Sequence, residues 1–240
     1  MTATVQLAFA TPAELPDDDD WLSAREIAVV QGLKVAKRAL DWKLGRWAAK
    51  KLARRARLRD GLDGPHAIRA GTPTAAVEIL AAADGAPLLW IDGRPAACSL
   101  SISHSHRLAM AALADSAAAV GCDLERVEPR SPAFIETFLT AAEADRVALA
   151  PAGERPLIAN AIWAAKEAVL KSTRDGLRKD TRAVQIEFGP AASGPPGWQR
   201  FRGRLDDSCY DGLWRQRDVW VQAIAVRADW SMTAKRNSQV

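Results

Sequence analysis

The sequence predicts an α+β protein made of two similar α/β lobes, related to each other by an internal pseudo-twofold duplication. In each half of the chain, helix-like sequence is followed by strand-like sequence. Each helical region begins with a capping box, at Ser23 and at Thr140, and the tetrapeptide WAAK recurs at residues 47–50 and 163–166. The first tetrapeptide starts 24 residues after Ser23 and the second starts 23 residues after Thr140. A shared cap, spacing and element order favour a duplicated unit.

The first half begins with a weakly alternating segment and a proline- and aspartate-rich loop, after which Ser23 opens a helical region that continues to about residue 58. Turn-rich sequence over residues 60–74 closes this region. Strands are expected over residues 5–10, 77–80, 87–92, 100–103, 108–114 and 120–127.

The second half repeats this order. Thr140 opens a helical region, the sequence breaks over residues 151–156, and a helix follows over residues 157–172. Strands are expected over residues 184–188 and 220–226. We therefore expect a first lobe over residues 1–116, a second lobe over residues 117–231 and a flexible tail over residues 232–240.

The composition excludes several classes of protein. Hydrophobic residues make up 48% of the 240 residues and charged residues 26%, as in an ordinary folded protein. The longest apolar run has seven residues, at 108–114, so no membrane span is expected. The N-terminus lacks the basic and apolar regions of a secretory signal, which predicts a cytoplasmic protein. Three widely spaced cysteines exclude a disulfide framework and a CxxC-type zinc site.

Basic residues are concentrated in residues 34–59, which contain eleven lysines and arginines and one acid, Asp41. Such a stretch is typical of a site for a phosphorylated cofactor, an acidic protein or a nucleic acid, and also of a helix whose charges simply face water. A non-catalytic binding module for acidic protein or nucleic acid is therefore the alternative to an enzyme.

The two copies of WAAK differ at the next position, which is Lys51 in the first half and Glu167 in the second. Glu167 and Lys171 are four residues apart on a predicted helix and share one face. By itself, this pair is better explained as an ordinary surface ion pair.

Two more carboxylates, Asp123 and Glu125, alternate with apolar residues in the expected strand at 120–127. Side chains two apart on a strand point the same way, so these two line one face. Paired carboxylates repel each other unless a cation neutralises them, and oxygen ligands of this kind suit Mg²⁺. A solvated edge strand is the other interpretation of the same pattern.

A third cluster, residues 101–106, places serines and histidines at a strand end, where they suit anion binding. His104 is the stronger candidate, although a single histidine is often only structural. The sequence has no GxSxG nucleophile motif and no P-loop, which argues against serine hydrolases and P-loop nucleotide-binding proteins.

Together, Ser103-His104-Ser105, Gly121-x-Asp123-x-Glu125 and Trp163-x-x-Lys166-Glu167-x-x-x-Lys171 resemble the motifs of the 4'-phosphopantetheinyl transferases of the surfactin-synthetase-activating (Sfp) type. That family's signatures are roughly [VI]GxDxE and W[SA]xKEAxxK. The resemblance spans nearly the whole chain, including the length and duplication of the monomeric two-lobed members. At position 164 the chain has Ala, where many members have Ser or Thr.

The resemblance implies transfer of the phosphopantetheine arm of coenzyme A to a serine hydroxyl of an apo carrier domain, with release of 3',5'-ADP. Asp123, Glu125 and Glu167 would hold Mg²⁺, or Mn²⁺, on the pyrophosphate. Glu167 would take the proton of the attacking serine directly or through water, and Lys171 would stabilise or protonate the departing phosphate.

The resemblance also implies which residues bind coenzyme A and which partners to expect. The predicted coenzyme A contacts are Arg46, Arg94, Ser103, His104 and Lys171, with Lys50 as a weaker candidate. The expected partners are coenzyme A and a carrier domain, without nucleic acid or membrane, and the protein is expected to be a monomer. Whether the carrier belongs to fatty-acid, polyketide or peptide synthesis stays open.

Overall fold

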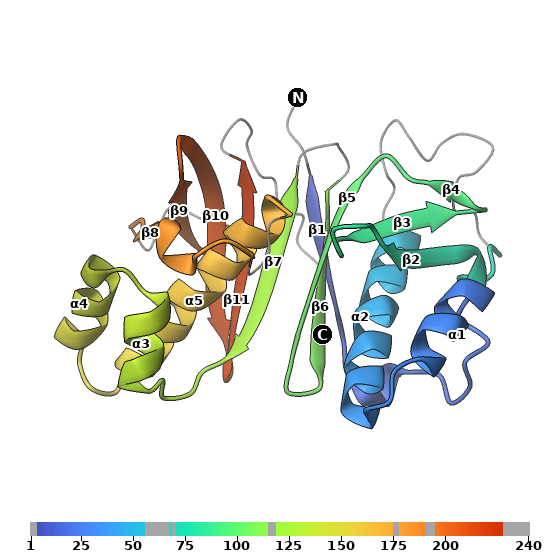
Figure 1. Ribbon diagram of the computed structural model, residues 1–240, viewed down its shortest axis with the longest axis horizontal. Coiled ribbons are helices and arrows are strands. Elements are labelled where there is room, and N and C mark those ends of the chain that lie inside the picture. The colour runs from blue at the N-terminus through green and yellow to red at the C-terminus, as the bar shows by residue number, and fades with distance from the viewer. Residues whose placement is uncertain are drawn as a thin grey trace. The chain divides into compact units, whose positions relative to one another are not determined.

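The computed structural model describes residues 4–55, 68, 71–114, 119–174, 178–190 and 195–227. The chain divides into two compact units, one before residue 119 and the other over residues 119–230. The described residues form a mixed α/β structure with five α-helices and three sheets (Figure 1). The expected lobe boundary at residues 116 and 117 and the expected tail at 232–240 lie outside these residues.

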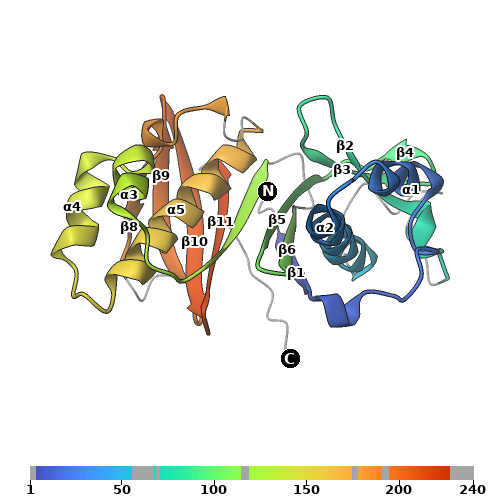
Figure 2. The same cartoon turned by 60° about the horizontal axis from the view of Figure 1, so that its bottom comes forward.

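The first unit contains two helices and two three-stranded sheets. One sheet has the order β1-β6-β5 and the other β2-β3-β4. Helix α2 packs against strands β1, β5 and β6 (Figure 2). The bounds are β1 (Val5–Ala10), α1 (Ala24–Gln31), α2 (Ala36–Arg55), β2 (Val77–Ala81), β3 (Pro87–Ile91), β4 (Arg94–Pro95), β5 (Ser99–Ser105) and β6 (Leu108–Ala114), with 3-10 turns at Pro12–Glu14 and Thr74–Ala76.

The single helical region expected from Ser23 to about residue 58 is two helices. Helix α1 ends at Gly32, and α2 begins four residues later at Ala36 and is described as far as Arg55. Glycine is a poor helix former, and the break lets Val30 of α1 pack into a small core with Trp21 and Leu22. Tertiary packing thus decides a boundary that helical periodicity alone does not show.

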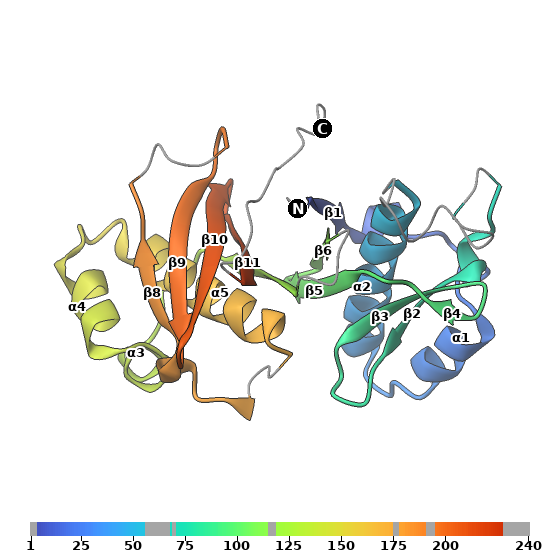
Figure 3. The same cartoon turned by 90° about the horizontal axis from the view of Figure 1, so that it is seen from above.

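The second unit is a five-stranded antiparallel sheet of order β7-β11-β10-β9-β8, with α5 packed against it (Figure 1). Strand β8 lies at one edge of the sheet (Figure 3) and β7 lies at the other. The bounds are β7 (Val120–Arg126), α3 (Pro132–Phe138), α4 (Ala141–Leu149), α5 (Arg155–Ser172), β8 (Gln185–Phe188), β9 (Gln199–Leu205), β10 (Ser208–Arg217) and β11 (Trp220–Arg227), with a 3-10 turn at Thr181–Ala183.

Three elements of this unit, α3, β9 and β10, were not predicted from the sequence. Helix α3 is short, and its cap Ser131 and first residue Pro132 were the available signals. Strands β9 and β10 form a hairpin whose exposed positions are rich in arginine and aspartate, so their apolar positions form no continuous run. No described helix is long and apolar enough to cross a membrane.

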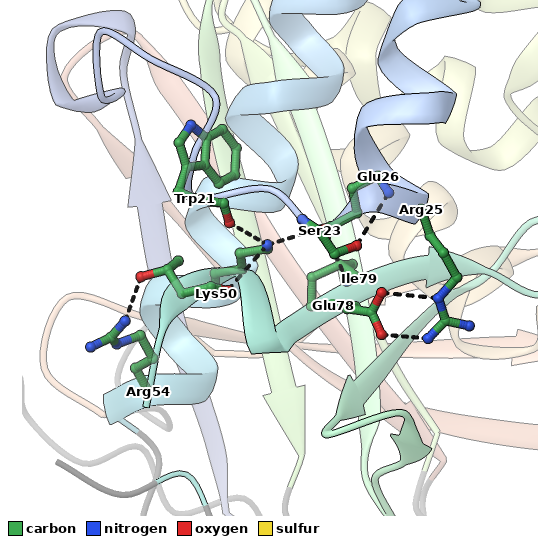
Figure 4. A network of polar contacts seen from close by, with 9 residues as sticks. Trp21, Ser23, Arg25, Glu26, Lys50, Arg54, Glu78 and Ile79 are labelled. Atoms are coloured by element: carbon green, nitrogen blue, oxygen red, sulfur yellow. Dashed lines mark hydrogen bonds and ion pairs between the residues drawn. The ribbon is translucent and has the colours of Figure 1, made fainter. Parts of the chain in front are cut away.

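A buried ion pair anchors the first unit. The Nζ atom of Lys50 lies 2.6 Å from Oε2 of Glu26, and both side chains are fully buried (Figure 4). Glu26 also accepts hydrogen bonds from the backbone amides of Ser23 and Ile79, at 2.9 Å each. Lys50 donates further hydrogen bonds to the carbonyl oxygens of Trp21 and Thr74. The capping box of α1 is thereby joined to α2 and to β2.

The second unit contains a matching pair. The Nζ atom of Lys166 lies 2.7 Å from Oε2 of Glu143. Glu143 accepts hydrogen bonds from the backbone amides of Thr140, at 2.8 Å, and Ile186, at 2.9 Å. Lys166 also donates to two carbonyl oxygens near the start of β8. In each unit, the WAAK lysine therefore binds the glutamate of the preceding capping box, and that glutamate also binds a strand amide.

We predict that removing either glutamate strongly destabilises its unit. Glu26→Ala and Glu143→Ala each leave a buried lysine without its counter-charge, which costs about 3–5 kcal/mol. Urea unfolding followed by circular dichroism measures the loss. Glu14→Ala is the matched control. The Glu14 carboxylate is half exposed, so losing its ion pair with Lys51 should lower the free energy of unfolding by less than about 1 kcal/mol. A loss in the capping-box variants no larger than in this control would contradict the prediction.

Candidate functional site

The candidate site depends on a very close contact between strand β7 and helix α5. A Cβ atom placed on Gly121 would lie 1.8 Å from the carbonyl oxygen of Ala168 and 2.6 Å from the backbone nitrogen of Ser172. No side chain fits in that space, so only glycine allows the strand to lie directly on the helix. The glycine of the GxDxE pattern is therefore required by packing.

This contact fixes which face of β7 meets α5. Gly121, Asp123 and Glu125 are two residues apart and therefore share one face of the strand. Gly121 lies against the backbone of Ala168 and Ser172, Asp123 binds Lys171, and Glu125 binds Trp163. The face of β7 that carries both carboxylates is thus turned toward α5.

Asp123 meets Lys171 in this alignment. Its Oδ1 atom lies 2.6 Å from the lysine Nζ, and the aspartate side chain is only 5% exposed. Burial lowers the pKa of Lys171, but the charges of Asp123, Cys122 and Glu167 and the hydrogen bond to Asp123 outweigh this and raise it overall. Lys171 is therefore a firmly protonated cation beside the carboxylates.

Glu167 lies on α5 one helical turn before Lys171 and is buried. Burial raises its pKa to about 7, the negative charges of Asp123 and Glu125 add to the rise, and Lys171 opposes it. Its buried Oε1 atom accepts no hydrogen bond from any residue that the structure describes. A carboxylate with a pKa near neutrality is suited to accept a proton or to bind a cation.

Glu125 is held by two donors. Its Oε1 accepts a hydrogen bond from Nε1 of Trp163, at 3.0 Å, and its Oε2 lies 2.7 Å from Nη2 of Arg130. Burial and then the charge of Asp123 raise the pKa of Glu125, whereas Arg130 and the Trp163 hydrogen bond oppose the rise. The third carboxylate of the cluster is therefore oriented by the protein.

The three carboxylates have the donor chemistry of a divalent-cation site. Asp123, Glu125 and Glu167 supply only oxygen donors, which is the chemistry that Mg²⁺ prefers. Within the described ranges, no three or more His, Cys, Asp or Glu side chains are arranged as a metal site. Asp123 and Glu125 instead face Lys171 and Arg130. The donor set and the partnerless Oε1 of Glu167 fit a cation, provided that the carboxylates turn toward it.

In the first unit, Arg46 is the most unusual of the predicted coenzyme A contacts. Its guanidinium lies over the ring of Trp42, 4.3 Å from the centroid, and burial lowers its pKa to about 10. Its buried Nε donates no hydrogen bond to any described residue. A buried donor of this kind is suited to an acceptor oxygen of a ligand.

The remaining predicted contacts are placed differently. His104 on β5 is half exposed, with its Nδ1 3.9 Å from Oδ2 of the buried Asp41, whereas Ser103 is buried beside it. Arg94 is exposed on β4. Lys50 is fully buried and bound to Glu26. This placement argues against direct contact of Lys50 with coenzyme A phosphate, and we give it a structural role.

The basic segment at residues 34–59 is less strongly basic in the structure than in the sequence. Four of its lysines lie within 2.9 Å of a carboxylate oxygen, in the pairs Lys37–Asp41, Lys43–Asp19, Lys50–Glu26 and Lys51–Glu14. Arg57 and Arg59 lie outside the described residues. Three of these four acids come from outside the segment, so pairing reduces its net charge, which weakens the argument for a nucleic-acid binding module.

Two residues of the site were missed at the sequence level. Arg130 lies just beyond the GxDxE strand, and its sequence context contains no signal for its role. Asn160 accepts a hydrogen bond from Arg130 and is the single polar residue between Leu157 and Ala165. A buried polar residue inside an apolar helix is a signal that could have identified Asn160.

The second unit thus has a carboxylate and lysine cluster of the kind used in phosphoryl-group transfer. Residues 119–224 match the family model of the 4'-phosphopantetheinyl transferase superfamily (ACPS). The match contains Asp123, Glu125, Glu167 and Lys171, whereas His104 and Arg46 lie before it. No curated protein matches the chain.

We predict that Glu167 makes the stability of the metal-free protein depend on pH. Its folded pKa of about 7 lies above its ordinary value of 4.5, so the folded state binds the extra proton between these values. The contribution of Glu167 to stability is therefore fully present below about pH 4.5 and is lost as the pH rises through 7, by up to about 3 kcal/mol. Glu167→Gln should be more stable than wild type at pH 8 and should flatten this slope.

Urea unfolding at several pH values with a chelator present measures this effect. Glu125 has a raised pKa as well and leaves a smaller slope of the same sign in the variant. Equal slopes in the two proteins would show that Glu167 ionises as an ordinary carboxylate.

Proposed function

We propose that this protein transfers the 4'-phosphopantetheine arm of coenzyme A to a serine hydroxyl of an apo carrier domain and releases 3',5'-ADP. One observation supports this proposal most: Asp123, Glu167 and Lys171 converge on one face of β7 and α5 inside the segment that matches the transferase superfamily. The match covers only residues 119–224. The activity, the Sfp-type assignment and the partners are therefore our proposals.

In this proposal, Glu167 accepts the proton of the serine hydroxyl as the oxygen attacks phosphorus. Its pKa of about 7 makes it a base near neutral pH, and its Oε1 has no competing partner among the described residues. Lys171 stays protonated because Asp123 raises its pKa, and its ammonium stabilises the charge on the departing phosphate. The new serine O–P bond forms as the P–O bond to 3',5'-ADP breaks.

Asp123, Glu125 and Glu167 are the residues that we propose as ligands of Mg²⁺ or Mn²⁺. When bound, the cation neutralises pyrophosphate oxygens. Without it, Asp123 is paired with Lys171 and Glu125 with Arg130.

Arg46, Arg94, Ser103 and His104 are the residues that we propose as coenzyme A contacts in the first unit. Arg46 is the best supported of them, because its Nε donates to no described residue. His104 and Arg94 are accessible, and Ser103 is buried beside His104. This set adds to Lys171, which we propose as a contact in the second unit.

We also infer that the two units arose by duplication, as the Sfp-type assignment requires. The support is chemical: in each unit, the WAAK lysine binds the capping-box glutamate, and that glutamate binds a strand amide. A duplicated chain contains both halves by itself, so we propose that the enzyme is a monomer. We also propose that it is cytoplasmic. The carrier domain, whether of fatty-acid, polyketide or peptide synthesis, is unassigned.

The test is the intact mass of apo carrier domains after incubation with the protein, coenzyme A and Mg²⁺. We expect a gain of one phosphopantetheine that disappears when the metal is chelated. Glu167→Gln should lower the rate by about a hundredfold or more, because the variant lacks the base and one ligand charge. Glu187→Gln, on the exposed side of edge strand β8, is the control and should leave the rate unchanged.

Several carrier domains, from fatty-acid, polyketide and peptide systems, belong in the same experiment. No mass gain on any of them would overturn the transferase proposal. The alternative binding module predicts a different result, namely salt-sensitive and metal-independent binding of nucleic acid that survives Glu167→Gln. A different Mg²⁺-dependent pyrophosphate enzyme would lose its own activity in that variant without ever modifying a carrier.

A further inference from the structure

We propose that Arg130 is a positioning residue for the carboxylate site, which acts by fixing the orientation and offsetting the charge of Glu125. The inference rests on the proposed function only in taking Asp123, Glu125 and Glu167 as the metal-binding set. The contacts that support it lie entirely within the second unit.

The guanidinium of Arg130 has four neighbours, of which the weakest is Glu128, whose Oε1 lies 3.7 Å from Nη1. Its Nη2 donates to Oε2 of Glu125 at 2.7 Å, and its Nε donates to Oδ1 of Asn160 at 2.8 Å. The ring of Phe134 lies against it, with the guanidinium carbon 4.7 Å from the ring centroid. The side chain is only 16% exposed. A planar fork bound at two nitrogens and stacked on a ring has little freedom to move.

Asn160 is itself fixed by the backbone. It is fully buried on α5, and its Nδ2 donates to the carbonyl oxygens of Glu128 and Pro156, at 2.7 Å each. Those two bonds determine which end of the amide is the oxygen, and that oxygen faces Arg130. The arginine is therefore anchored to α5 as well as to the strand side of the site.

Both oxygens of Glu125 have a donor in this arrangement. Trp163 binds Oε1 through its indole N–H, and its ring packs against Phe134 and Phe138 with centroids 5.2 and 4.9 Å away. Arg130 binds Oε2. A carboxylate held at both ends by packed donors cannot turn toward a cation without giving up one of these bonds.

Charge compensation follows from the same contacts. Asp123 pairs with Lys171, and Glu125 pairs with Arg130. Affinity for a divalent cation rises with the uncompensated charge of its ligands. Arg130 thus keeps Glu125 oriented and partly neutralised, and thereby limits the metal affinity of the free protein.

The test is Mn²⁺ binding to the purified full-length protein, measured by electron paramagnetic resonance without coenzyme A or carrier. Arg130→Gln frees Glu125 and should bind Mn²⁺ roughly three- to tenfold more tightly than wild type. Arg130→Lys keeps the charge and should return the affinity toward that of wild type. Arg146→Gln is the matched control, because Arg146 also stacks on a phenylalanine but lies on α4 and contacts no carboxylate of the cluster.

A second readout follows the position of Glu125 directly. The indole N–H resonance of Trp163, assigned with Trp163→Phe, should move upfield and exchange faster with solvent in Arg130→Gln, because its acceptor is no longer held. The same resonance should be unchanged in Arg146→Gln. Thermal unfolding of each variant checks that the unit remains folded.

The two readouts decide the inference separately from the proposed function. Unchanged or weaker Mn²⁺ binding in Arg130→Gln, with the indole resonance unmoved, would overturn it. So would an equal gain in affinity from Arg130→Gln in a Glu125→Gln background, since Arg130 would then act without Glu125. If wild type binds no Mn²⁺, the proposed metal site fails, and the Trp163 resonance alone decides whether Arg130 positions Glu125.

Discussion

The contact between β7 and α5 at Gly121 is the constraint on which the candidate site depends. The backbone of the strand lies against the backbone of the helix, in a space that a single Cβ atom would fill. This one contact turns the face of β7 that carries Asp123 and Glu125 toward α5, although Gly121 and Ala168 are more than 40 residues apart in the chain. Asp123 then meets Lys171, and Glu125 meets Trp163.

The carboxylates on this face repel one another, and two cationic side chains of the same unit offset that repulsion. Burial raises the pKa values of Glu125 and Glu167, and the nearby charge of Asp123 adds to both rises. Lys171 and Arg130 offset two of the charges, and Glu167 is left with the pKa nearest to neutrality. A site in this state can take up a proton, and it takes up a divalent cation when Asp123 and Glu125 turn from Lys171 and Arg130 toward it.

Much of the fold was visible in the sequence because its strands and caps are local features. Strands such as Val5–Ala10 and Leu108–Ala114, and the capping boxes at Ser23 and Thr140, were predicted at or near their observed bounds. The break at Gly32 and the hairpin of β9 and β10 were not, because packing and alternating polar strands decide them. Glu26 and Glu143 were expected only as caps, and their buried lysine partners required three-dimensional information.

By itself, the sequence determined which residue types are present at which spacing: the carboxylates of β7, the Glu167 and Lys171 face of α5, and the order of strands and helices around them. The tertiary structure alone decided the partners of these side chains. It placed Lys50 in a buried ion pair rather than at a surface, and it brought Arg130 and Asn160 to Glu125. The physical reason is that spacing fixes a direction along one element, whereas a hydrogen bond or ion pair depends on how two elements approach each other.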